Sequence, residues 1–432
     1  MLAAPVVILT IGLYESKTKL SRKGIYRMLL EQTQTLFFNF DGSMPHLPPT
    51  PTDDAIRTML AHNNQSCPLN EIIVSEANSG NLRNLRRFAF SAYRRANRSC
   101  RGCNFGIYSP PGQGKTFVVK KFAETIGIPF VFIQSPALEN SHMLFQQISE
   151  ALEKFGTPLI NLREGNEEKD GKESDFYLPP CIIFFDEANE LKKNLMKGSL
   201  LNAMEPDDAI LTVKQPGMNG KVIRVDCWEV CWIAATTERG DLFDAFDSRL
   251  STSIEWHSAN INELTMIIKA GLQKKVDANE LPFTPPDFIC ELISKYQKVP
   301  RLAIHGFGTK VVHQKLFTPN YCWKDCFEIV ASDIGMNDFG FTEKQTVILS
   351  ALGQRPIAEP RLADIARCRI AQIKKHELPG MMQYTDDGPY IISVSGKGMC
   401  ITKSGLRKLD EMGIKHNGTN ITAEHFESKR SY

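Results

Sequence analysis

The chain has 432 residues, of which 42% are hydrophobic and 23% are charged, and its formal net charge is +2. This composition is that of a globular protein, and the length suits roughly two to four domains. The small net charge excludes a chain that binds nucleic acid through its overall charge, so any nucleic-acid surface must be local. The eleven cysteines are scattered and form no secreted disulfide framework, which indicates a reducing, cytoplasmic location.

The first 65 residues precede the first recognisable motif. The apolar run from Leu2 to Leu13 is too short to span a bilayer, and it lacks the preceding basic residues of a secretory signal. We expect a buried strand or an accessory segment here and no membrane contact. The Pro/Thr-rich stretch from Pro45 to Thr52 is typical of a linker. Residues 1–65 are therefore predicted to be an N-terminal extension and linker, without an assigned role.

A run of arginines without an intervening acid follows. The intervals place several of them on one helical face, which fits a solvated face, a subunit interface or a surface that faces DNA. The arginines are Arg83, Arg86, Arg87, Arg94, Arg95, Arg98 and Arg101. Cys100 and Cys103 have the spacing of metal ligands, but no second pair matches them, so we interpret this pair as incidental rather than as a zinc site.

The strongest motif in the chain is Ser109–Thr116, with the sequence SPPGQGKT. An apolar run before it indicates a buried strand over 106–109, and residues 117–123 have the pattern of a helix. At such a strand-to-helix turn, backbone N–H groups face phosphates, Lys115 reaches the outer phosphates and the Thr116 hydroxyl binds Mg²⁺. Ser109 occupies the place of the usual first glycine. The predicted contacts to ATP are Pro111, Gly112, Gln113, Gly114, Lys115, Thr116 and Phe117.

A second apolar run ends in two acidic residues. Cys181–Phe185 is predicted to be a fully buried strand, and Asp186 and Glu187 follow it directly. Open parallel sheets place their ligands at the carboxyl ends of the strands. Asp186 is therefore predicted to hold Mg²⁺, and Glu187 to polarise the water that attacks the terminal phosphate. Together with the phosphate loop, the pair predicts an ATPase.

A further predicted strand, Val230–Ala235, ends in two threonines. A hydroxyl at the strand tip, that of Thr237, is predicted to position the water or to sense the terminal phosphate. Arg249 follows twelve residues later. An arginine placed beyond a helix can reach into a neighbouring subunit and stabilise transition-state charge there.

These motifs resemble the RuvB family, the AAA+ motor of bacterial Holliday-junction branch migration. The resemblance covers about residues 66–413. The matching segments include Pro136–Glu139, Ala203–Glu205, Ala234–Thr237, Pro300–Ala303 and Gly335–Gly340. Residues 210–225 resemble the hairpin that precedes the strand ending in Thr237, in shape rather than in sequence.

The resemblance implies several further assignments. Arg301 would be the second sensor, which couples the lid to the nucleotide state, and Ile72 and Ile73 would contact the adenine, although Val74-Ser75 replaces the usual Gly-Gln. A hexameric ring is implied, in which Arg249 acts in trans. The hairpin would bind a junction-binding partner like RuvA, and the DNA would be a duplex or a four-way junction.

The fold class that follows is α/β. Residues 66–256 are predicted to form an AAA+ P-loop ATPase domain with a parallel sheet, and Asn161–Tyr177 is an exposed, acidic loop inserted into it. Residues 257–330 show helical periodicity and would form a small helical lid. Residues 331–415 resemble a winged helix, and 416–432 form a tail.

Within the predicted winged helix, Thr342 and Gln345 have the spacing of a capping box. Helices are expected over 360–367 and 368–376, and a two-stranded wing over 390–394 and 399–401. Lys397 at the wing tip, with Lys403 and Arg407 nearby, is the predicted DNA contact. Ser395 stands where the family usually has arginine, and the unit is barely basic, so a protein-binding role for it stays open.

The leading interpretation is thus an ATP-dependent DNA motor of RuvB type. One alternative keeps the ATPase but assigns it to loading or remodelling replication or mobile-element proteins. Another is a module in which nucleotide only organises a DNA-bound assembly.

Overall fold

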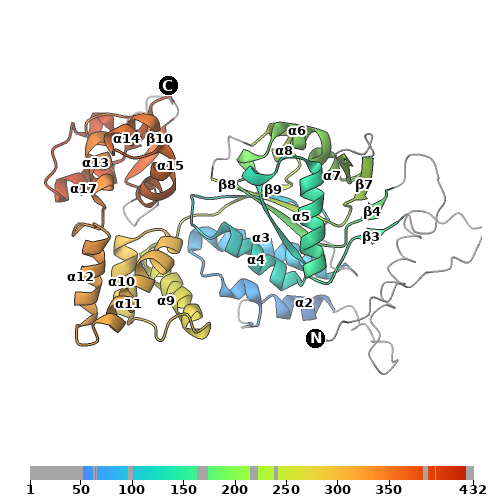
Figure 1. Ribbon diagram of the computed structural model, residues 1–432, viewed down its shortest axis with the longest axis horizontal. Coiled ribbons are helices and arrows are strands. Elements are labelled where there is room, and N and C mark those ends of the chain that lie inside the picture. Colours follow the sequence, from blue (N-terminus) through green and yellow to red (C-terminus); the bar gives the residue numbers. More distant parts are fainter. Residues whose placement is uncertain are drawn as a thin grey trace, which may run out of the picture.

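The computed structural model describes residues 52–61, 64, 66–95, 101–162, 174–214, 222–237, 242–382, 388–394 and 396–424. These residues form an α/β unit, a helical unit and a C-terminal unit that follow one another along the chain (Figure 1). No helix among them is both long enough and apolar enough to cross a membrane.

A five-stranded parallel sheet, in the order β2-β5-β8-β1-β9, forms the centre of the α/β unit. The strands β1, β5 and β8 lie within one residue of the predicted ranges. The edge strand β9 was not predicted, because Ile254 is its only buried residue and leaves no apolar run to recognise. The strands are β1 (Phe105–Tyr108), β2 (Phe130–Gln134), β5 (Ile182–Asp186), β8 (Cys231–Thr236) and β9 (Thr252–Glu255).

Helices cover both faces of this sheet. Each face therefore packs into an apolar core of its own. Along β8, Cys231 and Ile233 pack in the cluster that contains α3 (Glu76–Tyr93) and α4 (Lys115–Ile126). Trp232 lies on the opposite face, in the cluster that contains α5 (Ser141–Lys154). This alternation follows from the two-residue period of a strand. Figure 1 shows α3 and α4 on one side of the sheet and α5 on the other.

The N-terminal helix α2 (Asp53–Met59) belongs to the same packed body as the sheet. Ile56 and Leu60 are buried in the cluster that also contains residues of α3 and β1. The predicted break at residue 65 therefore does not separate two cores. Residues 1–51 lie outside the described part of the chain.

A smaller sheet, in the order β3-β4-β7-β6, lies next to the main one. The strands β6 (Ile210–Lys214) and β7 (Val222–Asp226) pair antiparallel, so the predicted hairpin is present. The ends of the predicted acidic loop pair as β3 (Ile160–Asn161) and β4 (Phe176–Tyr177). Its charged centre, residues 163–173, and the hairpin tip lie outside the described residues.

The helical unit has a core of its own, built from residues such as Leu264, Ile293 and Phe327. Asn260 and Glu263 form a capping box at the start of its first helix. The predicted helical character of 257–330 is confirmed. The helices are α9 (Ile261–Asp277), α10 (Asp287–Tyr296), η6 (Leu302–Gly308), α11 (Thr309–Phe317) and α12 (Trp323–Asp333).

The C-terminal unit combines helices with an antiparallel hairpin around a third core. The predicted capping box of Thr342 and Gln345 is present. The predicted helix over 360–367 ends early because Arg367 has a φ of 50°, in the left-handed region. The elements are α13 (Glu343–Leu352), α14 (Glu359–Ile365), α15 (Ile370–Gln372), η7 (Ile373–Glu377), α16 (Leu378–Met382), β10 (Ile391–Val394), β11 (Gly398–Ile401) and α17 (Lys403–Glu411).

Candidate nucleotide-binding site

The phosphate loop connects β1 to α4, as predicted. Gly112 and Gly114 have φ values of 77° and 83°, a region that favours glycine. Gly112 is also in close contact with the helical unit, which we call the lid. A Cβ built on Gly112 would lie 2.4 Å from the Cγ1 of Val299. Backbone conformation and space thus both require glycine at this position.

Lys115 is buried at the centre of the loop. Its ammonium donates hydrogen bonds to the carbonyl oxygens of Ser109, at 2.7 Å, and Pro110, at 3.3 Å. Burial lowers the pKa of Lys115 to about 8; the charges of Asp186 and Glu187 oppose this shift, and that of Arg301 adds to it. A cation that has lost its hydration in this way is stabilised by any bound anion.

The two predicted carboxylates lie at the carboxyl end of β5. Asp186 is the last residue of the strand, and Glu187 is exposed. Glu187 adopts φ 54° and ψ 49°, a left-handed conformation that is rare outside glycine and asparagine. Such conformations cost of order 1–3 kcal/mol and cluster at functional sites.

The tip of β8 carries the two threonines in different environments. Thr236 is buried, and its hydroxyl donates to the Oδ1 of Asn189, 2.9 Å away, in the turn η3 (Ala188–Glu190) that follows Glu187. Thr237, the residue predicted to sense the terminal phosphate, is the next along the chain and is exposed. The buried threonine therefore ties β8 to the turn that carries the carboxylates, and the role of Thr237 stays a prediction.

Arg249 is held within its own chain. Its guanidinium forms an ion pair with Glu205 and donates to the carbonyl oxygens of Leu201, at 3.2 Å, and Ala245, at 2.9 Å. Action in a neighbouring subunit requires Arg249 to exchange Glu205 for an external anion.

The lid contributes the other wall of a narrow cleft beside the phosphate loop. Arg301 precedes η6, and its Cβ is 4.0 Å from a Cβ built on Gly112. The cleft has a volume of about 20 Å³, enough for about one water molecule. It is lined by Ile73, Ser75, Asn78, Gln113, Trp256, His257, Ala259, Glu263, Ile267 and Pro300.

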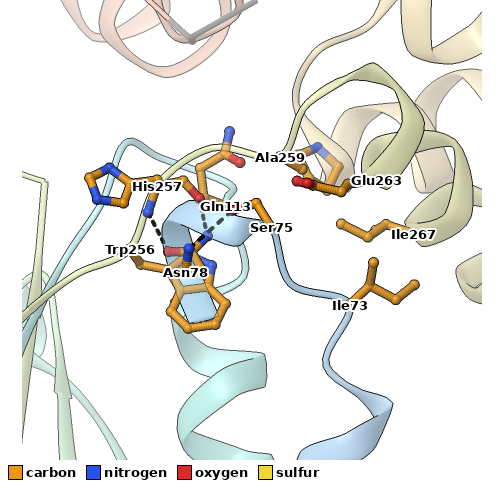
Figure 2. A pocket seen from close by; sticks show the side chains of 10 residues that line it. Ile73, Ser75, Asn78, Gln113, Trp256, His257, Ala259, Glu263 and Ile267 are labelled. Atoms are coloured by element: carbon orange, nitrogen blue, oxygen red, sulfur yellow. Dashed lines mark hydrogen bonds between the residues drawn. The ribbon is translucent and has the colours of Figure 1, made fainter. Parts of the chain in front are cut away.

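Of the two isoleucines predicted to contact the adenine, only Ile73 lines this cleft, whereas Ile72 is buried in the core of the α/β unit. Asn78 binds the backbone of His257, which follows Trp256: its amide nitrogen donates to the carbonyl oxygen of His257, at 2.8 Å, and its oxygen accepts from the His257 N–H, at 2.9 Å (Figure 2). Asn78 and His257 are 179 residues apart, so no local pattern could reveal this pair.

These features fit a nucleoside triphosphate with Mg²⁺. Left-handed glycines leave the loop open to phosphate oxygens, and the desolvated ammonium of Lys115 lies beside them. Thr116, at the start of α4, and Asp186 would hold the cation. Two protein oxygens are a usual number for Mg²⁺, which keeps several waters.

The predicted DNA contacts are all exposed. Lys397 lies in the turn between β10 and β11. Lys403 opens α17, and Arg407 follows one turn later on the same face. Ser395 lies outside the described residues, and the role of the three cations stays a prediction.

The arginine run does not form one basic surface in the part of the chain that the structure describes. Arg86 is partly buried and donates to the Oδ1 of Asn70. Arg94 forms an ion pair of 3.0 Å with Asp53. Arg98 and Cys100 lie outside the described residues, and Cys103 is buried. No cluster of three or more metal-ligating side chains occurs among the described residues.

Comparisons with known proteins agree with this geometry. Residues 105–258 match the profile of the "ATPase family associated with various cellular activities (AAA)". Over 201 residues the chain is 27% identical to the Holliday junction branch migration complex subunit RuvB of Phytoplasma mali, a match that covers 46% of this chain and 49% of that protein. A peroxisomal ATPase of Schizosaccharomyces pombe is 24% identical over 238 residues, which cover 50% of this chain and 23% of that protein.

A solved RuvB structure from Thermotoga maritima, of a mutant, superposes with a TM-score of 0.56 at 17% identity, over 79% of this chain and 97% of that one. At this identity the likeness shows the fold alone. The chain matches about half the length of the RuvB relative and about a quarter of the peroxisomal one. Residues 105–258 thus match the AAA family profile, within a chain of α/β AAA+ P-loop fold that is similar to the fold of RuvB.

Proposed function

We propose that this protein is an ATP-hydrolysing motor that acts on DNA in the manner of the RuvB branch migration subunit. The observation that carries the proposal is the convergence at one edge of the parallel sheet. The phosphate loop follows β1, Asp186 ends β5 and Glu187 follows it, and Thr237 follows β8. Phosphoryl transfer needs little more from a protein than such positioning and charge.

In the proposed mechanism, the loop amides and Lys115 hold the phosphates. Thr116 and Asp186 would hold Mg²⁺, which would supply positive charge to the phosphate oxygens. Glu187 orients the attacking water and accepts its proton. Glu187 has a left-handed backbone, with a φ of 54°, directly after the strand. Asn189, fixed by Thr236, holds the turn in which Glu187 lies.

Arg249 and Arg301 would link turnover to movement. Arg301 lies against the phosphate loop from the lid side, so a change in phosphate number changes its surroundings. Arg249 would leave Glu205 and bind the phosphate of the neighbouring subunit in a ring, which the resemblance implies to be hexameric. The exposed Lys397, Lys403 and Arg407 would bind the backbone of duplex or junction DNA, and the β6–β7 hairpin would meet a RuvA-like partner.

A second candidate function is the loading or remodelling of other proteins. The match to a peroxisomal ATPase favours it, since the same kind of domain occurs there outside any RuvB subunit. The two candidates share the ATP site and differ in what the C-terminal unit and the hairpin bind.

The proposal is tested by ATP turnover and by unwinding of a synthetic four-way junction, with and without a junction-binding protein. Turnover should disappear in Glu187→Gln, and turnover equal to that of the wild type would refute both functions. Arg249→Ala should lose turnover but keep ATP binding, with a thermal melt to confirm that the lost hydrogen bonds have not unfolded the domain. Junction-independent turnover without unwinding would favour the remodelling function.

A further inference from the structure

Gln113 is a buried polar residue with no partner for its amide nitrogen. It lies between the two left-handed glycines of the phosphate loop and is only 7% exposed. Its Nε2 is buried and has no hydrogen-bond partner among the described residues. Because unpaired buried donors are rare and destabilising, this amide is best understood as prepared for a ligand.

The amide lines the cleft between the phosphate loop and the lid. Figure 2 shows Gln113 on one side of this cleft, with Ala259 and Glu263 on the other. Neighbouring polar groups are already engaged. The Ser75 hydroxyl accepts from the N–H of Asn78, at 3.1 Å, and the Glu263 carboxylate accepts two hydrogen bonds from Asn260, at 2.6 and 3.0 Å.

Apart from Asn78 and His257, the remaining walls of the cleft are apolar and come from both units. Ile73 and Trp256 belong to the α/β unit, and Ile267 and Pro300 to the lid. Apolar walls with a single free amide suit a flat aromatic ring that is held by its faces and identified at its edge. At a volume of about 20 Å³ the cleft is too small for such a ring in this conformation, so binding would require it to widen.

We propose that Gln113 selects the base of the nucleotide and favours adenine over guanine. A side-chain amide can pair twice with adenine, donating to N7 and accepting from the N6 amino group. Guanine presents the acceptors N7 and O6 at the same edge, which leaves the Gln113 oxygen facing another oxygen. This inference rests on the proposed function in one respect, that the loop binds a nucleoside triphosphate.

The test is calorimetric titration of the intact chain with ATP, GTP and inorganic tripolyphosphate, each with Mg²⁺. Gln113→Leu keeps the size of the side chain and removes the amide. It should weaken ATP binding roughly 5- to 150-fold, the range of one good bidentate pair. Binding of GTP and tripolyphosphate should change little, so the preference for ATP should disappear.

Ile73→Ala is the matched control in the same cleft. It removes apolar contact that either base would make, so it should weaken ATP and GTP binding by the same factor and leave their ratio unchanged. Gln113→Glu replaces the amide donor by an acceptor and should also lose the preference for ATP. This second variant keeps the test decisive if Gln113→Leu does not fold.

The inference is overturned if the wild type binds ATP and Gln113→Leu keeps the wild-type ratio of ATP to GTP affinity. It is also overturned if Ile73→Ala changes that ratio as much as Gln113→Leu does. Binding of tripolyphosphate with no preference between ATP and GTP would refute the selection by Gln113 and leave the proposed phosphate site intact. Absence of binding by all three probes would refute the proposed function as well.

Discussion

The contact between the phosphate loop and the lid can be tested by adding one methyl group. In Gly112→Ala, the new Cβ would lie 2.4 Å from the Cγ1 of Val299, and the residue would keep a φ of 77°. The left-handed backbone costs about 1–2 kcal/mol for a non-glycine residue. Overpacking adds about 1–3 kcal/mol. We therefore expect Gly112→Ala to lower the free energy of unfolding by roughly 2–5 kcal/mol.

Two further variants separate these two costs. Gly102 has a φ of 74° and no atom within 4 Å of a Cβ built on it, so Gly102→Ala should show the backbone cost alone, about 1–2 kcal/mol. Val299→Ala removes the clashing atom and leaves only ordinary contact, since the Val299 Cβ is 3.9 Å from the new methyl group. By itself it should cost about 1–3 kcal/mol from lost apolar burial.

The measurement is a double-mutant cycle by denaturant unfolding of the intact chain. The loss in Gly112→Ala/Val299→Ala should be smaller than the sum of the two single losses by about 1–3 kcal/mol, which is the overpacking term. Strict additivity, together with equal losses in Gly112→Ala and Gly102→Ala, would show that the lid does not rest on the phosphate loop in solution.

Three other predictions concern single residues. The pKa of Lys115 is about 8 in the free protein, and bound phosphate raises it. ATP affinity, measured by calorimetry, should therefore be constant below about pH 8 and fall roughly tenfold per pH unit above it. An affinity that stays flat up to pH 9 would contradict the burial of the Lys115 ammonium. Glu187→Gly and Glu187→Gln should both lose turnover, but only glycine relieves the φ of 54°, so it should be the more stable of the two by about 1 kcal/mol in denaturant. Asn78→Ala leaves the His257 N–H and carbonyl unpaired and should cost roughly 2–4 kcal/mol in thermal unfolding, against less than about 1 kcal/mol for Asn81→Ala at an exposed hydrogen bond. Equal losses would show that Asn78 does not hold the backbone of His257.

The local sequence pattern was sufficient to predict most of the strands of the α/β unit. The strands that end in Asp186 and Thr236 are continuous apolar runs, because both faces of a parallel sheet are covered. The edge strand β9 escaped prediction for the opposite reason: it buries one side chain, Ile254, and its sequence has no period to detect. Ile72 and Ile73 show the same limit, since adjacent residues of an extended segment point to opposite sides and only packing decides which one faces the cleft.

The sequence by itself predicted the residues of the proposed nucleotide site: a glycine-rich loop with Lys115, and two carboxylates at the end of a buried strand. These signals are local, because a phosphate loop between a strand and a helix needs glycines and a lysine at fixed positions along the chain. Only the tertiary structure decided the partners: Glu205 for Arg249, Val299 against Gly112, and Asn78 with the backbone of His257. Those contacts arise from the order of the strands in the sheet and from the packing of the lid against the phosphate loop. Both bring together residues that are far apart in the sequence, so no local sequence pattern reveals them.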